Sequence, residues 1–156
     1  MVGRDFTVER CLVTQEKLQA ICLCGDAFAI PVQERAGFSE YFQKIDNFAC
    51  FLIARKETEI AGFSAFYMND QESKTAFVTL IAVAPHMQGQ NIGTLLLEES
   101  EKLARENGMR RMFLKVRSEN LKAIRFYEKQ GYTIEFQEDE AYLSGSKELG
   151  ENRQND

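Results

Sequence analysis

The feature that most constrains the fold is an apolar run over residues 76–84, Ala-Phe-Val-Thr-Leu-Ile-Ala-Val-Ala, which ends at Pro85. The run is rich in Val, Ile, Leu and Phe and is almost wholly apolar. Such a run is typical of a strand that is buried on both faces, so we expect it at the centre of a sheet. Beyond Pro85 the apolar spacing becomes helical, which predicts an amphipathic helix that carries Ile92, Leu95, Leu96 and Leu103 on one side.

The rest of the chain predicts a mixture of strands and helices. We expect strands over residues 6–13, 49–54, 60–68, 111–117, 132–136 and 140–143. Helices are expected over residues 15–30, 33–44 and 121–130, with a break at Pro31 because proline interrupts a continuous helix. A hairpin meander that leads into strand–helix–strand–helix–strand implies an α/β (α+β) fold. Its sheet would be mixed and mostly antiparallel, with about six to seven strands and helices on both faces.

Length and charge narrow the class of protein. The 156 residues suit one domain, which we place at residues 1–143, and residues 144–156 are expected to fray because they are polar and lack apolar anchors. The 19 basic and 24 acidic side chains give a net charge of −5, which argues against a nucleic-acid partner. No apolar run approaches the ~20 residues of a membrane helix, and the first residues lack the apolar stretch of a signal peptide. We therefore expect a cytoplasmic protein with no membrane partner.

Cysteine and histidine usage argues against a metal site. Cys11, Cys22, Cys24 and Cys50 show no C-x-x-C spacing, and His86 is the only histidine. Structural zinc needs a cluster of such ligands at short spacing. We expect no metal and four reduced thiols, most of them buried.

The loop between the central strand and the amphipathic helix is the most informative segment. Residues 85–94 read Pro-His-Met-Gln-Gly-Gln-Asn-Ile-Gly-Thr. A helix that begins after such a loop directs unpaired N–H groups toward one point, which favours a phosphate or another anion. Gly89 and Gly93 allow the backbone to approach a ligand closely. The segment lacks the Lys-Ser/Thr of a Walker loop and the G-x-G-x-x-G of a dinucleotide site. An ordinary strand-to-helix turn is the alternative interpretation.

Positive charge is concentrated just after this loop. Between residues 110 and 129, seven basic side chains face two acidic ones, a local charge of +5 in a chain of −5. A polyphosphate ligand would be attracted by that field, whereas a solvated helix face would account for about half of the charges. The basic residues are Arg110, Arg111, Lys115, Arg117, Lys122, Arg125 and Lys129.

Two motifs together resemble the GNAT superfamily of acyl-CoA N-acyltransferases. The first, Gln88-Gly89-Gln90-Asn91-Ile92-Gly93, is similar to the family's Q/R-x-x-G-x-G/A motif between a strand and a helix. The second, over residues 120–132, is similar to its N-x-x-A-x-x-x-Y-x-x-x-G-F/Y pattern. The family's middle glycine is Asn91 here. If that position needs a positive φ, asparagine is the most tolerant replacement for glycine.

The resemblance implies an acetyl-CoA site in a GNAT-like domain whose fourth and fifth strands are splayed around the cofactor. The pantetheine arm and the thioester carbonyl would be held by the backbone of Ile81, Ala82 and Val83. The pyrophosphate would be cradled by the amides of Gln88, Gly89, Gln90, Asn91, Ile92 and Gly93, with Thr94 at the start of the helix. Asn120 would hydrogen-bond the pantetheine or phosphate end of the cofactor, and Tyr127 would protonate the departing thiolate.

Acyl transfer to an amine needs a neutral amine, a polarised carbonyl and a protonated leaving thiol. An amine with a pKa of ~10.4 must lose a proton before it attacks, and a phenol of pKa ~10 can donate a proton to the thiolate. We assign the second role to Tyr127, and a packing tyrosine in the core is the alternative. No general base is identified, because the central strand has no carboxylate.

The other candidates for the base come from loops and helices. The segment 112–120 resembles ribosomal-protein N-terminal acetyltransferases, which carry a glutamate base where this chain has Lys115. Lys115 is expected to be solvated or to face a phosphate, and His86 to lie in the loop at the phosphate end. Glu34 or Glu40 could act through a water relay.

The acceptor is expected to be chosen by residues 27–42 and the final strand pair. We favour a primary amine of a small molecule, such as an amino sugar or an amino acid. A peptide N-terminal acetyltransferase is the second reading, and a non-catalytic acyl-CoA sensor is the third. A homodimer is left open.

Overall fold

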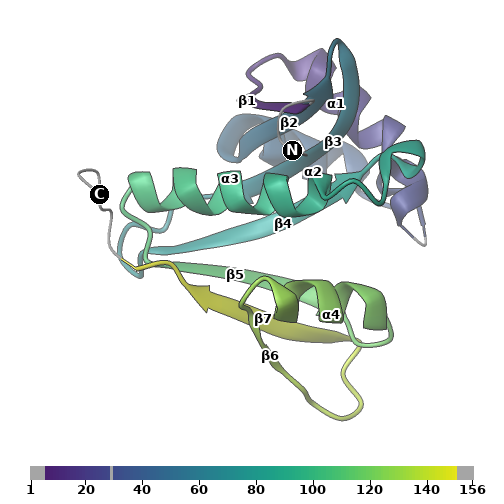
Figure 1. The fold of residues 1–156 in the computed structure, drawn as a ribbon. Coiled ribbons are helices and arrows are strands. Elements are labelled where there is room, and N and C mark those ends of the chain that lie inside the picture. Colours follow the sequence, from purple (N-terminus) through teal and green to yellow (C-terminus); the bar gives the residue numbers. More distant parts are fainter. Residues whose placement is uncertain (1–5, 29, 151–156) are drawn as a thin grey trace. The chain divides into compact units, whose positions relative to one another are not determined.

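The seven strands form one mixed sheet in the order β1-β2-β3-β4-β5-β7-β6 (Figure 1). The structure is a computed structural model, and it describes residues 6–28 and 30–150. The strands are β1 (Phe6–Arg10), β2 (Cys50–Lys56), β3 (Glu59–Tyr67), β4 (Thr75–Val83), β5 (Arg111–Arg117), β6 (Thr133–Glu135) and β7 (Tyr142–Glu148). The helices are α1 (Thr14–Leu23), α2 (Phe38–Phe48), α3 (Ile92–Glu106) and α4 (Leu121–Lys129), with short 3-10 turns η2 (Gly25–Ala27), η3 (Val32–Glu34) and η4 (Pro85–Met87). This is the single α+β architecture expected from the sequence.

Within this fold the residues gather in two compact units. Of the described residues, unit 1 contains 6–28, 30–67 and 80–100, and unit 2 contains 68–79 and 101–150. The fourth strand contributes to both, because its first five residues belong to unit 2 and its last four to unit 1. Each unit is described below on its own.

Unit 1 is built on the antiparallel meander β1-β2-β3. Phe6 pairs with Lys56, and Cys50 pairs with Phe66. Helix α3 packs on one face of β3, where Ser100 Oγ lies 2.8 Å from Ser64 Oγ. Helices α1 and α2 pack against β3 and β2 from the opposite face (Figure 1). The core between these layers is made of apolar side chains that are almost fully buried, among them Ile21, Ile45, Phe51, Ile53, Phe63, Phe66 and Leu96.

Unit 2 is built around β5, which pairs in parallel with the start of β4 and antiparallel with β7. The parallel pairing joins Thr75–Val78 to Arg111–Leu114, and both strands continue beyond it. The antiparallel pairing runs along the whole of β5, from Arg111↔Glu148 to Arg117↔Tyr142. Glycine at position 145 of β7 leaves room for two neighbours, because a Cβ there would lie 2.9 Å from the Cδ1 atoms of Leu114 and Ile134 and would force these side chains to shift.

The last strand corrects the expected carboxyl-terminal boundary. We expected a strand over 140–143 and a frayed tail from Ser144, but β7 runs to Glu148 and Leu149 is buried. The apolar pattern misses these residues because Ser-Gly-Ser-Lys carries few apolar side chains. The strand forms because its backbone pairs with β5 on one side and β6 on the other. Residues 151–156 of the expected tail lie outside the described part of the chain.

Two other expectations are wrong in detail. The central strand is fourth of seven, but it alternates: Ala76, Val78, Leu80 and Ala82 are buried, and the residues between them are half-buried. An apolar run does not distinguish a fully covered face from a partly covered one. The first helix ends at Leu23 rather than residue 30, and the second begins at Phe38, after Gly37 with φ 77°. Among the described residues, no helix is both long enough and apolar enough to cross a membrane.

Candidate functional site

The loop between β4 and α3 begins with a 3-10 turn and contains two residues in the left-handed conformation. Pro85 begins a 3-10 turn, and the buried side chain of Met87 anchors that turn. Gly89 has φ 85° and Asn91 has φ 64°. A Cβ on Gly89 would touch nothing within 4 Å, so the backbone conformation rather than space calls for glycine. The positive φ of Asn91 confirms why asparagine is accepted where the family has glycine.

The loop delivers the chain directly into the first turn of α3. Leu95 N donates to Asn91 O at 3.1 Å, which closes the first turn of the helix. In any α-helix the earlier N–H groups have no acceptor within the helix, and the helix dipole adds partial positive charge there. Ile92 is buried, and Gly93 and Thr94 are half-buried. The exposed residues of the loop are Pro85, His86, Gln88, Gly89 and Asn91. This arrangement suits an anion that approaches the exposed side of the loop.

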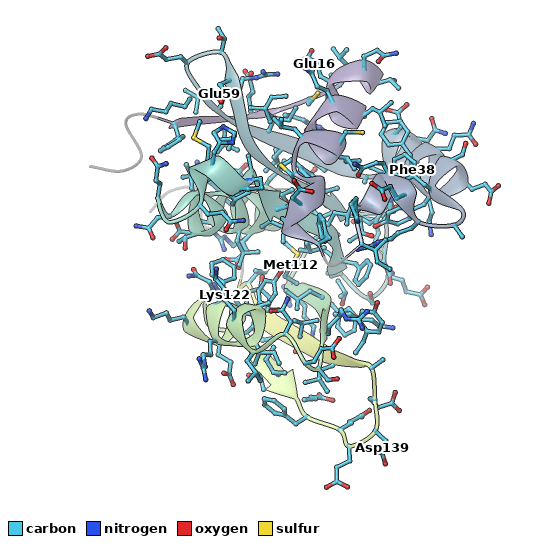
Figure 2. All side chains as sticks on the ribbon, turned by 90° about the vertical axis from the view of Figure 1, so that its right-hand side faces the viewer. Glu16, Phe38, Glu59, Met112, Lys122 and Asp139 are labelled. Carbon is cyan, nitrogen blue, oxygen red and sulfur yellow. The ribbon has the colours of Figure 1, made fainter. Side chains whose placement is uncertain are left out.

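Contacts with β3 hold the loop within unit 1. Ala84 N donates to Ala61 O at 2.8 Å, and a Cβ on Gly62 would lie only 2.7 Å from Ala82 O. His86 Nε2 lies 2.7 Å from Glu59 Oε1, in an exposed pair at the start of β3 (Figure 2 labels Glu59). The backbone segment Ile81–Val83 is thus fixed beside β3, with Ile81 and Val83 half-buried. His86 is confirmed as a surface residue of the loop.

Unit 2 contains the second predicted motif, on β5 and α4. Asn120 caps α4, because its Oδ1 accepts a hydrogen bond from Ala123 N at 3.1 Å. This contact uses the side-chain oxygen and leaves its NH₂ group for another partner. Tyr127 is half-buried on α4, with its ring centroid 5.2 Å from that of Phe126 and 5.8 Å from that of Tyr132. Within the described part of the chain the Tyr127 hydroxyl makes no hydrogen bond.

Burial raises the pKa of Tyr127 to about 12. The phenol therefore stays protonated at neutral pH and remains a proton donor. It is a weaker acid than the free phenol expected from the sequence, and it is weaker than a thiol with a pKa of ~8.5. Complete transfer of its proton to a free thiolate would therefore be uphill.

A buried polar cluster in unit 2, which the sequence did not indicate, positions the ring beside Tyr127. Glu101 is 6% exposed and accepts hydrogen bonds from the Tyr132 hydroxyl at 2.7 Å and from Lys147 Nζ at 2.9 Å. Burial and the Glu101 carboxylate together raise the pKa of Tyr132 far above its usual range. The three groups satisfy one another, and Tyr132 N also donates to Tyr127 O at 3.0 Å.

The candidate bases and the basic segment are exposed. Lys115, Glu34 and Glu40 are on the surface, which agrees with the expectation of a solvated Lys115. Arg111 pairs with Glu148 at 3.5 Å, and Arg117 pairs with Glu119 at 2.9 Å. The exposed basic side chains that remain on β5 and α4 include Lys115, Lys122, Arg125 and Lys129, of which Lys122 is labelled in Figure 2. This matches the expectation that part of the charge belongs to a solvated helix face.

The cysteines agree with the expected reduced thiols. Cys11, Cys24 and Cys50 are buried, Cys22 is exposed, and all four are free. In the residues that the structure describes, no group of His, Cys, Asp or Glu could hold a metal ion.

Fold and loop together define a domain of the acyltransferase class. The model of the Acetyltransferase (GNAT) family matches residues 21–132. The chain belongs to this family.

Two relatives from Bacillus subtilis (strain 168) are similar over part of the chain. One is named "Putative ribosomal protein bS18-alanine N-acetyltransferase" and is 30% identical over 94 residues, which cover 60% of this chain and 60% of that protein. The other, "Uncharacterized N-acetyltransferase YobR", is 37% identical over 79 residues, which cover 44% of this chain and 32% of that protein. The chain thus spans less than two thirds of these relatives.

Solved structures share the fold over nearly the whole chain. The ribosomal-protein-S18-alanine N-acetyltransferase from Escherichia coli has a TM-score of 0.76 and 19% identity, covering 96% of this chain and 97% of that one. The PaiA N-acetyltransferase from Thermoplasma acidophilum, solved in complex with coenzyme A, has a TM-score of 0.67 and 17% identity, covering 91% and 99%. At this identity the likeness shows the fold alone.

Proposed function

We propose that this protein transfers an acetyl group from acetyl-CoA to the primary amine of a small molecule, by direct attack of the amine. The observation that carries the proposal is the loop before α3, where Gly89 and Asn91 both adopt the left-handed conformation at the start of a helix. A loop of this kind presents backbone N–H groups, and those groups fit a pyrophosphate.

The proposal gives each predicted residue a role. The pantetheine arm would pair with the backbone of Ile81, Ala82 and Val83. The pyrophosphate would bind the amides of residues 88–93, with Thr94 in the first helical turn. Asn120 would use its NH₂ group, the part of its side chain not spent on capping α4. Tyr127 would donate a hydrogen bond to the sulfur.

In the reaction, the neutral amine nitrogen attacks the thioester carbonyl carbon, and the carbon–sulfur bond breaks. The products are an N-acetyl amide and the free thiol of coenzyme A. The new amide nitrogen loses a proton as it is acylated, which balances the proton that the sulfur gains. Because the Tyr127 phenol is a weak acid, its proton must be replaced in the same step rather than leave a lasting phenolate.

A peptide or protein N-terminus is the second candidate acceptor. It is supported by the two proteins named above as bS18-alanine N-acetyltransferases, one similar in sequence and one in fold. It is opposed by the exposed Lys115, which stands where the resemblance to that group of enzymes implies a glutamate base.

Release of thiol from acetyl-CoA in the presence of a panel of acceptors tests the proposal. The panel contains amino acids, amino sugars, polyamines and a peptide with a free alanine amino terminus. Sustained turnover with a small amine supports the proposal, and preference for the peptide supports the second candidate. Binding of acetyl-CoA with no turnover of any amine would identify a sensor instead.

A further inference from the structure

Two buried polar atoms of unit 1 lack partners among the residues that the structure describes. They are the Tyr67 hydroxyl, at the end of β3, and Gln33 Oε1, in η3. Leaving a buried polar group without a hydrogen bond costs about 1–3 kcal/mol, so natural proteins rarely keep one without a function. Gln33 falls within residues 27–42, the segment expected to choose the acceptor, and η3 packs against α2.

Helix α2 places an ammonium group, that of Lys44, over the Tyr67 ring. Lys44 Nζ lies 5.5 Å from the ring centroid. No carboxylate of the described chain forms an ion pair with Lys44, and the nearby Asp46 already binds Lys17 and Thr14. Tyr41, also on α2, is close enough to affect the ionisation of Tyr67.

The Tyr67 phenol is a donor and not a base. Burial, with a smaller contribution from Tyr41, raises its pKa to about 12, so it is neutral and protonated at physiological pH. Lys44 Nζ lies over the face of the same ring that carries the phenolic O–H. A neutral donor and an ammonium group together suit a carboxylate, because the hydrogen bond to a charged acceptor is reinforced by the opposite charge. A hydroxyl-rich amino sugar or a polyamine carries no such anion.

We propose that Tyr67 and Lys44 bind the carboxylate of the acceptor, and that the acceptor is therefore an amine of the amino-acid type. This inference rests on the proposed acetyltransferase activity and names its substrate class. The Tyr67 oxygen is covered in the free chain, so the group that covers it must move when the acceptor enters. The carboxylate then supplies the partner that the hydroxyl lacks.

The test compares amino acids with their carboxamides, which keep the amine and side chain but lose the negative charge. For wild-type protein, kcat/KM should be higher for the amino acid. Tyr67→Phe should lower kcat/KM for the amino acid by about 10-fold to 100-fold, the value of a hydrogen bond to a charged group, and change that for the carboxamide less than about twofold. Lys44→Met should lower the ratio of kcat/KM for the amino acid to kcat/KM for the carboxamide, and it should remove the dependence of this ratio on salt.

Thermal unfolding provides a readout that does not depend on activity. Tyr67→Phe removes an unsatisfied hydroxyl, so its melting temperature should equal or exceed that of the wild type. Tyr132→Phe is the matched control, since it removes a hydroxyl bonded to buried Glu101. That variant should melt at a lower temperature and keep the ratio of amino acid to carboxamide unchanged.

The outcomes separate this inference from the proposed function. If amines are acetylated but Tyr67→Phe leaves the ratio unchanged, or if carboxylate-free amines are preferred, the inference is wrong and the activity stands. A lower melting temperature for Tyr67→Phe with an unchanged ratio would show a structural hydroxyl satisfied by water. If no amine is acetylated by the wild type, the proposed function itself fails.

Discussion

The two predicted motifs differ in the groups that they would offer to a cofactor: the first offers backbone groups and the second offers side-chain groups. The loop over residues 88–94 in unit 1 offers backbone N–H groups, and the side chains of Gln88 and Asn91 are exposed, whereas Ile92 is buried. Helix α4 in unit 2 offers single side-chain atoms, namely the Asn120 NH₂ group and the Tyr127 hydroxyl. The first arrangement depends on backbone conformation, and the second depends on the identity of one residue.

The difference predicts opposite responses to substitution. A site made of backbone amides should tolerate the removal of a side chain. It should not tolerate a residue that disfavours the φ angle the loop needs, because the path of the backbone directs its amides. A side-chain site should fail when one oxygen is removed although the helix keeps its shape. The predictions below follow this contrast, from the largest expected effect to the smallest.

Removing the Tyr127 oxygen is expected to have the largest effect. Tyr127→Phe should keep the affinity for acetyl-CoA and lower the catalytic rate by about 10²–10⁴, the usual effect of a positioned acid. That factor corresponds to about 2.7–5.4 kcal/mol of transition-state stabilisation. Thiol release at saturating amine measures it, together with a pre-steady-state trace because product release can mask chemistry. If the burst and the steady rate are the same in both proteins, Tyr127 is a packing residue, and the contrast between a backbone site and a side-chain site is wrong.

A change of φ preference at Asn91 should have an intermediate effect. Asn91→Gly should preserve or tighten cofactor binding, because glycine adopts φ 64° without steric cost. In Asn91→Val the left-handed conformation costs roughly 1–2 kcal/mol or more, so affinity for acetyl-CoA should fall about tenfold.

The ligand-induced shift in melting temperature measures this pair. Acetyl-CoA at 100 times its dissociation constant should raise the free energy of unfolding of the wild type by about 2.7 kcal/mol, which raises the melting temperature by several degrees. Adenosine should raise both much less. Equal shifts for the Gly and Val variants would show that the loop does not bind through its backbone path.

Loss of a loop side chain should have the smallest effect. Gln88 is exposed, and its Nε2 lies 3.5 Å from Val83 O, at the limit of a hydrogen bond. Gln88→Ala should therefore change the affinity for acetyl-CoA by no more than about twofold, as is usual for a surface substitution. Calorimetric titration with the wild type in parallel would measure it. A tenfold loss would make the loop a side-chain site and contradict the comparison.

Local signals made the loop and several strands predictable. A position that needs positive φ leaves glycine or asparagine in the sequence, which is why Gly89 and Asn91 could be interpreted before the structure. Strand β5 was predicted with its observed bounds, because its side chains alternate between buried and exposed.

Features that depend on distant residues could not be predicted in the same way. Glu101 is satisfied by Tyr132 and Lys147, which lie 31 and 46 residues further along the chain. The second half of β7 has almost no apolar signal and forms through backbone pairing. The buried hydroxyl of Tyr67, whose ring contacts Lys44 of α2 from 23 residues earlier, is not indicated by the neighbouring sequence.

The fate of the acetyl group is the most direct test of the central claim. The purified protein would be incubated with acetyl-CoA labelled in the acetyl group and with the best amine of the panel, and the products would be separated and identified by mass. The account predicts labelled N-acetyl amine in the same molar amount as free coenzyme A thiol. Intact acetyl-CoA after incubation with every amine, or thiol released without an acetylated amine, would contradict it.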